Sequence, residues 1–116
     1  MQNVNLDYIG FLNGRLLIFK FLNSYDGSAY GEIICHNTWK YSEENSFEKG
    51  EGFPIFICDV RAVKLKGETI RAAFQYLKYG YDIPECEECY LLCMDSGDVC
   101  ITLICEAVDV EVYNKT

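Results

Sequence analysis

The sequence predicts one α+β domain spanning residues 1–116, in which an antiparallel sheet of five to seven strands packs one main helix on one face. A chain of 116 residues has the length of a single domain, and hydrophobic residues make up 50% of it, enough for a packed core. Aliphatic and aromatic runs bounded by turn residues recur along the chain and indicate strands. One segment, residues 68–79, has clear helical periodicity.

The first half of the chain predicts a hairpin, a loop and a long strand. Apolar runs flank a turn cluster at residues 23–28, which indicates that the two runs pair as antiparallel strands. A polar, glycine-bearing stretch follows, and then a second long apolar run. The expected strands are residues 14–22, 29–37 and 53–66, with a loop at 42–52.

The helix at residues 68–79 is predicted from one apolar face and one polar face. The apolar face repeats at the i, i+3, i+4, i+7 spacing and the polar face carries charge. Gly80 lies where a left-handed C-terminal cap is expected, and Pro84 lies beyond it. The apolar face is formed by Ile70, Ala73, Phe74 and Leu77, and the polar face by Arg71, Gln75 and Lys78.

The last third predicts a second hairpin, with strands at residues 88–94 and 99–105 around a turn at 95–98. Apolar residues occupy odd positions up to Cys105 and even positions from Val108 onward. Since alternate residues of a strand face opposite sides, this change of parity predicts a bulge or turn near Glu106 and Ala107.

The net charge of −8 is concentrated in residues 79–114, which contain acidic residues and no lysine or arginine. Binding to nucleic acid through phosphates requires clustered basic residues, so it is not expected, and neither is binding to anionic membranes. An acidic surface favours a basic protein partner, which it attracts electrostatically. The alternative is that the acids serve solubility alone.

The cysteines and the N-terminal sequence predict a cytoplasmic protein. Residues 1–7 contain no basic start and no apolar run, so they do not indicate a secretion signal. The longest apolar stretches are too short to span a bilayer. The chain contains 7 cysteines, an odd number, which together with the missing signal argues against a disulfide scaffold.

Cys86 and Cys89 form a C-x-x-C pair, the spacing at which two thiolates can share a zinc ion. A structural zinc site requires four ligands, and no second close pair exists, so Cys93 and Cys35 or His36 would have to complete it. A redox role is weaker, because neighbouring glutamates favour the neutral thiol. The simpler interpretation is two reduced cysteines leading into a strand.

No set of catalytic residues is convincing, so the chain is not predicted to be an enzyme. His36 is the only histidine, and its neighbour Cys35 should point to the opposite face of a strand. Catalysis by His36 would need a carboxylate and a deep pocket supplied from elsewhere in the chain. Phosphate-binding loops, nucleophile elbows and calcium loops are absent from the sequence.

Small size, an acidic C-terminal third and the lack of catalytic groups make the chain resemble, as a class, the immunity proteins that bacteria make against toxins. The resemblance implies that carboxylates cover a basic toxin surface, such as that of a nuclease. No cofactor is expected. The alternatives are a phage-encoded antagonist of a nucleic-acid-binding defence enzyme and a small zinc- or ligand-binding module. The predicted partner-binding residues are Asp82, Glu85, Glu87, Glu88, Asp95 and Asp98, with Tyr79 and Tyr81 beside them.

Overall fold

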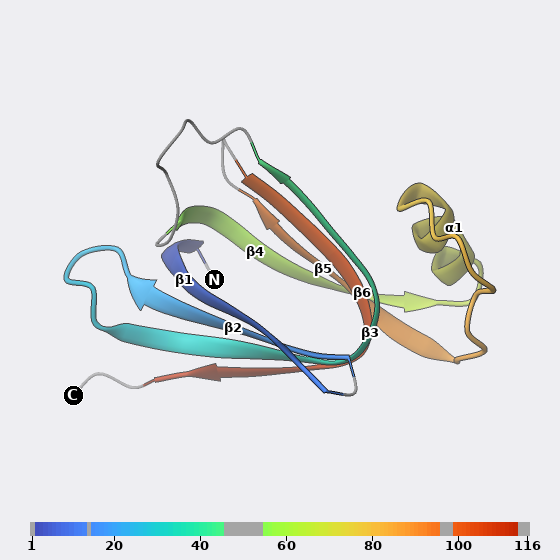
Figure 1. Cartoon of the computed structure of the whole chain (residues 1–116), viewed down its shortest axis with the longest axis horizontal. Coiled ribbons are helices and arrows are strands. Elements are labelled where there is room, and N and C mark those ends of the chain that lie inside the picture. The colour runs from blue at the N-terminus through green and yellow to red at the C-terminus, as the bar shows by residue number, and fades with distance from the viewer. Residues whose placement is uncertain (1, 14, 46–54, 96–98, 114–116) are drawn as a thin grey trace.

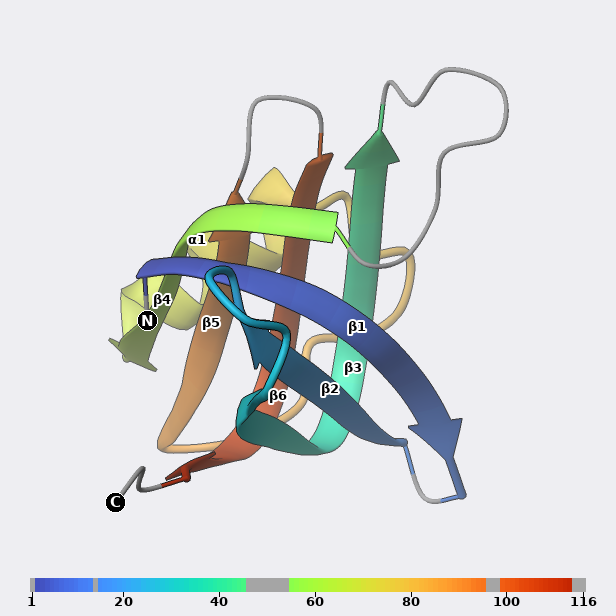
Figure 2. The same cartoon turned by 90° about the vertical axis from the view of Figure 1, so that its left-hand side faces the viewer.

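A computed structural model describes residues 2–13, 15–45, 55–95 and 99–113. Within these residues the chain forms six strands and one helix, arranged as Figures 1 and 2 show. The elements are β1 (Gln2–Leu12), β2 (Leu16–Asn23), β3 (Ala29–Asn45), β4 (Ile55–Lys66), α1 (Glu68–Tyr76), β5 (Glu88–Asp95) and β6 (Val99–Val112).

The six strands form a closed antiparallel barrel in the order β1-β2-β3-β6-β5-β4. The two longest strands, β3 and β6, pair with each other and bend sharply together, so that each contributes to two layers (Figure 1). One layer contains β1 and β2 with one half of each bent strand, and the other contains β4 and β5 with the other half. Figure 2 looks toward the side on which β1 crosses in front of the other strands.

The interior of the barrel holds the larger hydrophobic core. β2 illustrates its origin, because Leu17, Phe19 and Phe21 are buried while the residues between them are exposed or half-buried. Every buried member of this core lies on a strand: Val4, Leu6, Leu17, Phe19, Phe21, Ile33, Cys35, Ile57, Leu92, Met94, Val99, Ile101, Leu103 and Cys105. The sheet therefore buries its main core against itself.

The predicted α+β class is wrong, because the protein is mostly antiparallel β structure with one short helix. An open sheet that packs a helix and a closed barrel share the same alternation of apolar and polar residues, so periodicity does not separate them. The barrel is closed by β1 and β4, where Val4 pairs with Ile57 and Leu6 with Ile55. No strand was predicted at residues 2–12.

Both predicted hairpins are confirmed, although β3 and β6 are much longer than expected. β2 pairs with β3, and β5 pairs with β6. β3 continues to Asn45, into the expected loop at 42–52, of which residues 46–52 lie outside the described residues. The start of the strand expected at 53–66 and most of the turn at 95–98 also lie outside them.

The change of parity in β6 lies close to an irregularity in its pairing with β3. Cys105 and Val108 both pack against the barrel core, yet β6 is continuous through Glu106 and Ala107. The register shift lies in the partner strand, where Thr38 pairs with Cys105 and Lys40 with Ile104. Trp39 of β3 is therefore an extra residue in this pairing, opposite Cys105 and Ile104 and close to the predicted position, but it lies on β3 and not on β6.

Helix α1 ends at Tyr76, earlier than predicted, in a Schellman motif. The backbone N–H of Tyr79 donates to the carbonyl of Phe74 at 3.0 Å, and that of Lys78 donates to Gln75 at 3.0 Å. Lys78, not Gly80, occupies the left-handed position, with φ 56°. The rings of Phe74 and Tyr79 lie 4.8 Å apart and supply the apolar contact that accompanies this motif.

A second, smaller core lies between α1 and the outside of the barrel. Ile70 and Phe74 of the predicted apolar face are buried there, and Ala73 and Leu77 are partly buried beside them. The strands contribute Leu65, Cys89, Leu91, Ile104 and Trp39. The helix thus covers only one end of the barrel (Figure 1). No helix in the described ranges is long and apolar enough to cross a membrane.

Candidate partner-binding surface

The segment that joins α1 to β5, residues 77–87, carries three of the predicted acidic residues. We call it the α1–β5 connector. Asp82, Glu85 and Glu87 are all exposed on it. The ion pairs among the described residues involve none of these three carboxylates. They therefore present uncompensated negative charge to solvent, the state that a basic partner would recognise.

A groove of about 510 Å³ separates the connector from α1. Ile70, Ile83 and Pro84 give it an apolar part, and the two connector glutamates line it with Arg71. Arg71 was not among the predicted site residues, because only its place on the polar face of the helix was visible. The complete lining is Gly67, Ile70, Arg71, Ile83, Pro84, Glu85, Cys86 and Glu87.

The remaining predicted acids do not join this surface. Glu88, the first residue of β5, lies 3.7 Å from the amines of both Lys64 and Lys66, which compensate its charge. Asp95 ends the same strand, roughly 23 Å away at 3.3 Å per residue. Asp98 lies outside the described residues. The predicted acidic set is thus divided between the two ends of β5.

The aromatic residues near the connector differ in exposure. Tyr79 is partly buried, since its ring packs on Phe74. Tyr81 is 81% exposed, and the centroid of its ring lies 5.6 Å from that of Tyr79. Tyr76, which was not predicted as a site residue, is 79% exposed at the end of α1. Exposed tyrosines beside carboxylates supply apolar contact area together with a hydrogen-bonding hydroxyl. Tyr76 and Tyr81 suit contact with a partner better than Tyr79.

The C-x-x-C pair lies against the helix core. Cys89 is fully buried and Cys86 is half-buried. Burial, reinforced by the neighbouring Cys86, raises the pKa of the Cys89 thiol to about 12. Without a bound metal, this thiol is therefore neutral at physiological pH. Within the described ranges, no three His, Cys, Asp or Glu side chains converge on a possible metal position.

His36 has a carboxylate partner, and both side chains are largely exposed. Its Nε2 lies 2.7 Å from Oδ2 of Asp109, and the two side chains are 44% and 73% exposed. The pair joins β3 to the adjacent strand β6. Neither of the two cavities described for this structure includes His36 in its lining.

The thiols should differ in reactivity according to burial. In native protein under reducing conditions, we expect Cys58 and Cys100 to react first with a thiol reagent, because both are exposed. Cys35, Cys89 and Cys105 are buried and should react only after unfolding. Mass spectrometry of a time course of alkylation would measure the order. Early labelling of the three buried cysteines would contradict the two cores described above, because Cys35 and Cys105 lie in the barrel interior and Cys89 lies beneath α1.

A family model matches residues 1–112 of the chain. The chain belongs to that family. The description of the family is a bare "-like" label, which states no activity, ligand or partner. Membership therefore covers nearly the whole chain and assigns no function to it.

A solved structure resembles the barrel over most of its length. It is described as the crystal structure of an uncharacterized protein from Neisseria gonorrhoeae, with 22% sequence identity and a TM-score of 0.67. The match covers 96% of this chain and 92% of that one. At this identity the likeness concerns the fold alone. No curated protein is similar enough in sequence to count as a relative.

Proposed function

We propose that this protein binds and neutralises a basic protein partner, and that it acts as an immunity protein against a toxin. The observation that carries the proposal is the α1–β5 connector, where Asp82, Glu85 and Glu87 are exposed and take no part in the ion pairs among the described residues. Stable complexes commonly combine aromatic anchors with charges complementary to those of the partner. Tyr81 supplies the aromatic anchor within the same connector.

The other two described acids of the predicted set lie outside this surface. Glu88 is held by two lysines and Asp95 lies at the far end of β5, so neither adds to the connector. The groove between the connector and α1 joins apolar lining to two carboxylates. Such a groove suits a lysine or arginine of the partner, whose aliphatic stem packs on apolar groups while its charged end meets a carboxylate.

A cytoplasmic site of action belongs to this proposal. All seven cysteines are free, and three of them are buried. Unpaired cysteines in this number are typical of reducing compartments. An immunity protein would there meet its toxin before the toxin reaches its target.

The proposal is tested by affinity purification from the native host. Tagged protein is captured at low salt, washed at rising salt, and analysed by mass spectrometry. We expect one basic protein in stoichiometric amount, released as salt screens the acidic surface. Inhibition of the activity of that protein, reconstituted with purified components, then identifies the neutralising role.

A pair of matched variants distinguishes binding by the connector from attraction by the net charge of the protein. The double variant Glu85→Lys/Glu87→Lys and the control Glu106→Lys/Glu111→Lys change the net charge equally, and the four residues are all exposed. We expect capture to be lost in the first and kept in the second. Equal losses would mean that net charge alone attracts the partner. Absence of any basic protein at low salt would refute the proposal.

A further inference from the structure

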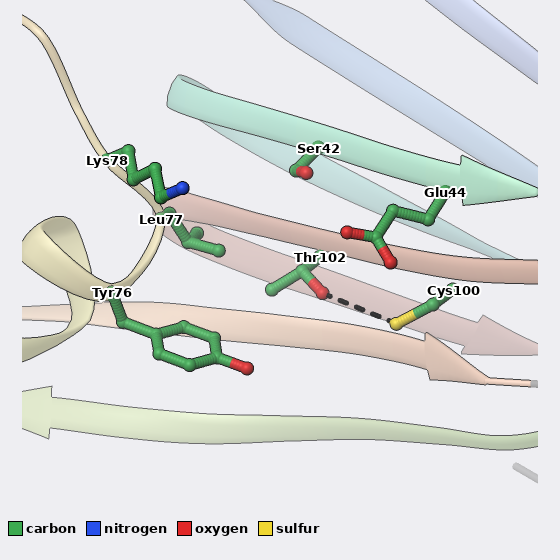
Figure 3. Close-up of a pocket in the computed structure, with 7 residues that line it drawn as sticks. All are labelled: Ser42, Glu44, Tyr76, Leu77, Lys78, Cys100 and Thr102. Atoms are coloured by element: carbon green, nitrogen blue, oxygen red, sulfur yellow. Dashed lines mark hydrogen bonds between the residues drawn. The ribbon is translucent and has the colours of Figure 1, made fainter.

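A second cavity, of about 360 Å³, lies beyond the C-terminal end of α1 and is independent of the connector groove (Figure 3). The end of the helix and the loop after it form one side, and the outward faces of β3 and β6 form the floor. Its lining consists of Ser42, Glu44, Tyr76, Leu77, Lys78, Cys100 and Thr102. A cavity of this size accommodates a small molecule.

The floor of the cavity is made of small polar side chains. Ser42 pairs directly with Thr102 across the two strands, and Glu44 pairs with Cys100. The Sγ of Cys100 lies 3.8 Å from Oγ1 of Thr102, the contact dashed in Figure 3. Because α1 ends at Tyr76, the helix covers the neighbouring apolar part of the sheet and leaves this part open.

The two charged groups of the cavity are separate from each other. Lys78 stands at the helix side and Glu44 on β3 (Figure 3). Among the described ion pairs neither residue takes part, although both line one cavity. The cavity thus offers one amine and one carboxylate, with hydroxyl groups on its floor.

The backbone of Lys78 supplies a second observation. Its φ of 56° lies in the left-handed region, where a side chain is disfavoured and glycine is the usual residue at this position of a helix end. The Schellman motif that ends α1 sets this conformation, because the residue at this position of the motif is left-handed. The conformation places the amine of Lys78 in the lining of the cavity.

We propose that this cavity binds a free α-amino acid as its zwitterion. Lys78 would donate to the carboxylate of the ligand, and the ammonium group of the ligand would donate to Glu44. A simple anion would meet Glu44 and a simple cation would meet Lys78, whereas a zwitterion pairs with both. Ser42 and Thr102 offer hydroxyls to the polar part of the ligand, and Leu77 and Tyr76 offer contact area to its side chain.

The test is isothermal titration calorimetry of the purified protein with each of the twenty free L-amino acids. We expect at least one to bind, and its affinity to fall about tenfold or more in Glu44→Gln and in Lys78→Gly. Glycine suits the left-handed backbone of residue 78, and Lys78→Asn provides a second variant that tolerates it. Lys20→Asn, which removes an exposed lysine of β2, is the matched control.

Blocked ligands assign each end of the amino acid to its residue. The amide of the bound amino acid lacks the carboxylate, so its weaker binding should not change further in Lys78→Gly. The N-acetyl derivative lacks the ammonium group, so its binding should not change further in Glu44→Gln. Failure of all twenty amino acids to bind would overturn the proposal, as would binding that is equal in wild type and both cavity variants. These readouts do not depend on a protein partner, so they stand or fall separately from the proposed function.

Discussion

Truncation of Phe19 to alanine is expected to lower the free energy of unfolding by about 3–5 kcal/mol, which would unfold much of a domain of ordinary stability. Phe19 is fully buried in the barrel interior and ranks among its largest side chains. Its ring contributes transfer free energy and contacts with surrounding core residues, and a closed barrel collapses poorly around the space left behind. Urea denaturation followed by circular dichroism measures the loss.

Phe11→Ala is the matched control, since the same atoms are removed from a ring that is 63% exposed on β1. Phe11 retains an edge-to-face contact with Tyr41, with ring centroids 5.4 Å apart, so a loss of about 1 kcal/mol is expected. Similar losses in the two variants would mean that the barrel interior is not the main core of the protein.

The second large effect is destabilisation at alkaline pH. Burial raises the pKa of the Cys89 thiol from 9.0 to about 12. The pKa of Cys35 is raised further above its usual range by its hydrogen bond with Cys105 and by burial in the barrel. Both thiols are therefore neutral in the folded state at a pH where they ionise in the unfolded chain. Their contribution to the free energy of unfolding is complete below pH 9. It is lost as pH rises from about 9 toward the pKa that each thiol has in the folded state.

Each such thiol weakens folding by at most about 1.4 kcal/mol per pH unit within this window. Urea denaturation at pH 8, 9, 10 and 11, with reductant present, measures the slope. Other groups also titrate there, so the variants Cys35→Ala and Cys89→Ala are compared with Cys100→Ala, whose thiol is exposed. The free energy of unfolding should depend less steeply on pH in Cys35→Ala and Cys89→Ala, and as steeply as in wild type in Cys100→Ala. An identical slope in all three would refute the assignment of the effect to the buried thiols.

Local structure followed from the sequence wherever the pattern was unambiguous. The helical face of Ile70 and Phe74 is buried, and both hairpins form where turn residues separate two apolar runs. β1 was missed because Asn3, Asn5 and Asp7, which disfavour strands, alternate with only two buried apolar residues. That alternation of Val4 and Leu6 was the available signal. Closure of the barrel depends on this strand, so missing it led to the wrong fold class.

The candidate surface could be predicted only in part. The clustering of acids in the sequence indicated Asp82, Glu85 and Glu87, because residues close together in an exposed connector also lie close together on the surface. Compensation of Glu88 by two lysines depends on the register of β4 and β5, which pairs Lys66 with Glu88.

The cavity beyond the end of α1 could not be predicted from the sequence. Ser42 and Thr102 meet only through the long pairing of β3 with β6. The periodicity predicted that Lys78 lies within the helix. The helix ends before Lys78, where the ring of Phe74 packs on that of Tyr79, and the sequence pattern does not reveal this contact.

The pairing of the two bent strands has a consequence for biosynthesis. Gly31 lies opposite Val112, and the whole first half of β3 has β6 as one of its two neighbours. During translation, β1, β2 and β3 therefore leave the ribosome well before β6, the strand that completes their layer, has been synthesised. Sheets built from such distant segments fold slowly, in about milliseconds to seconds. Until then the emerging chain exposes an unpaired strand edge, which makes chaperone contact during translation the expected route to the native barrel.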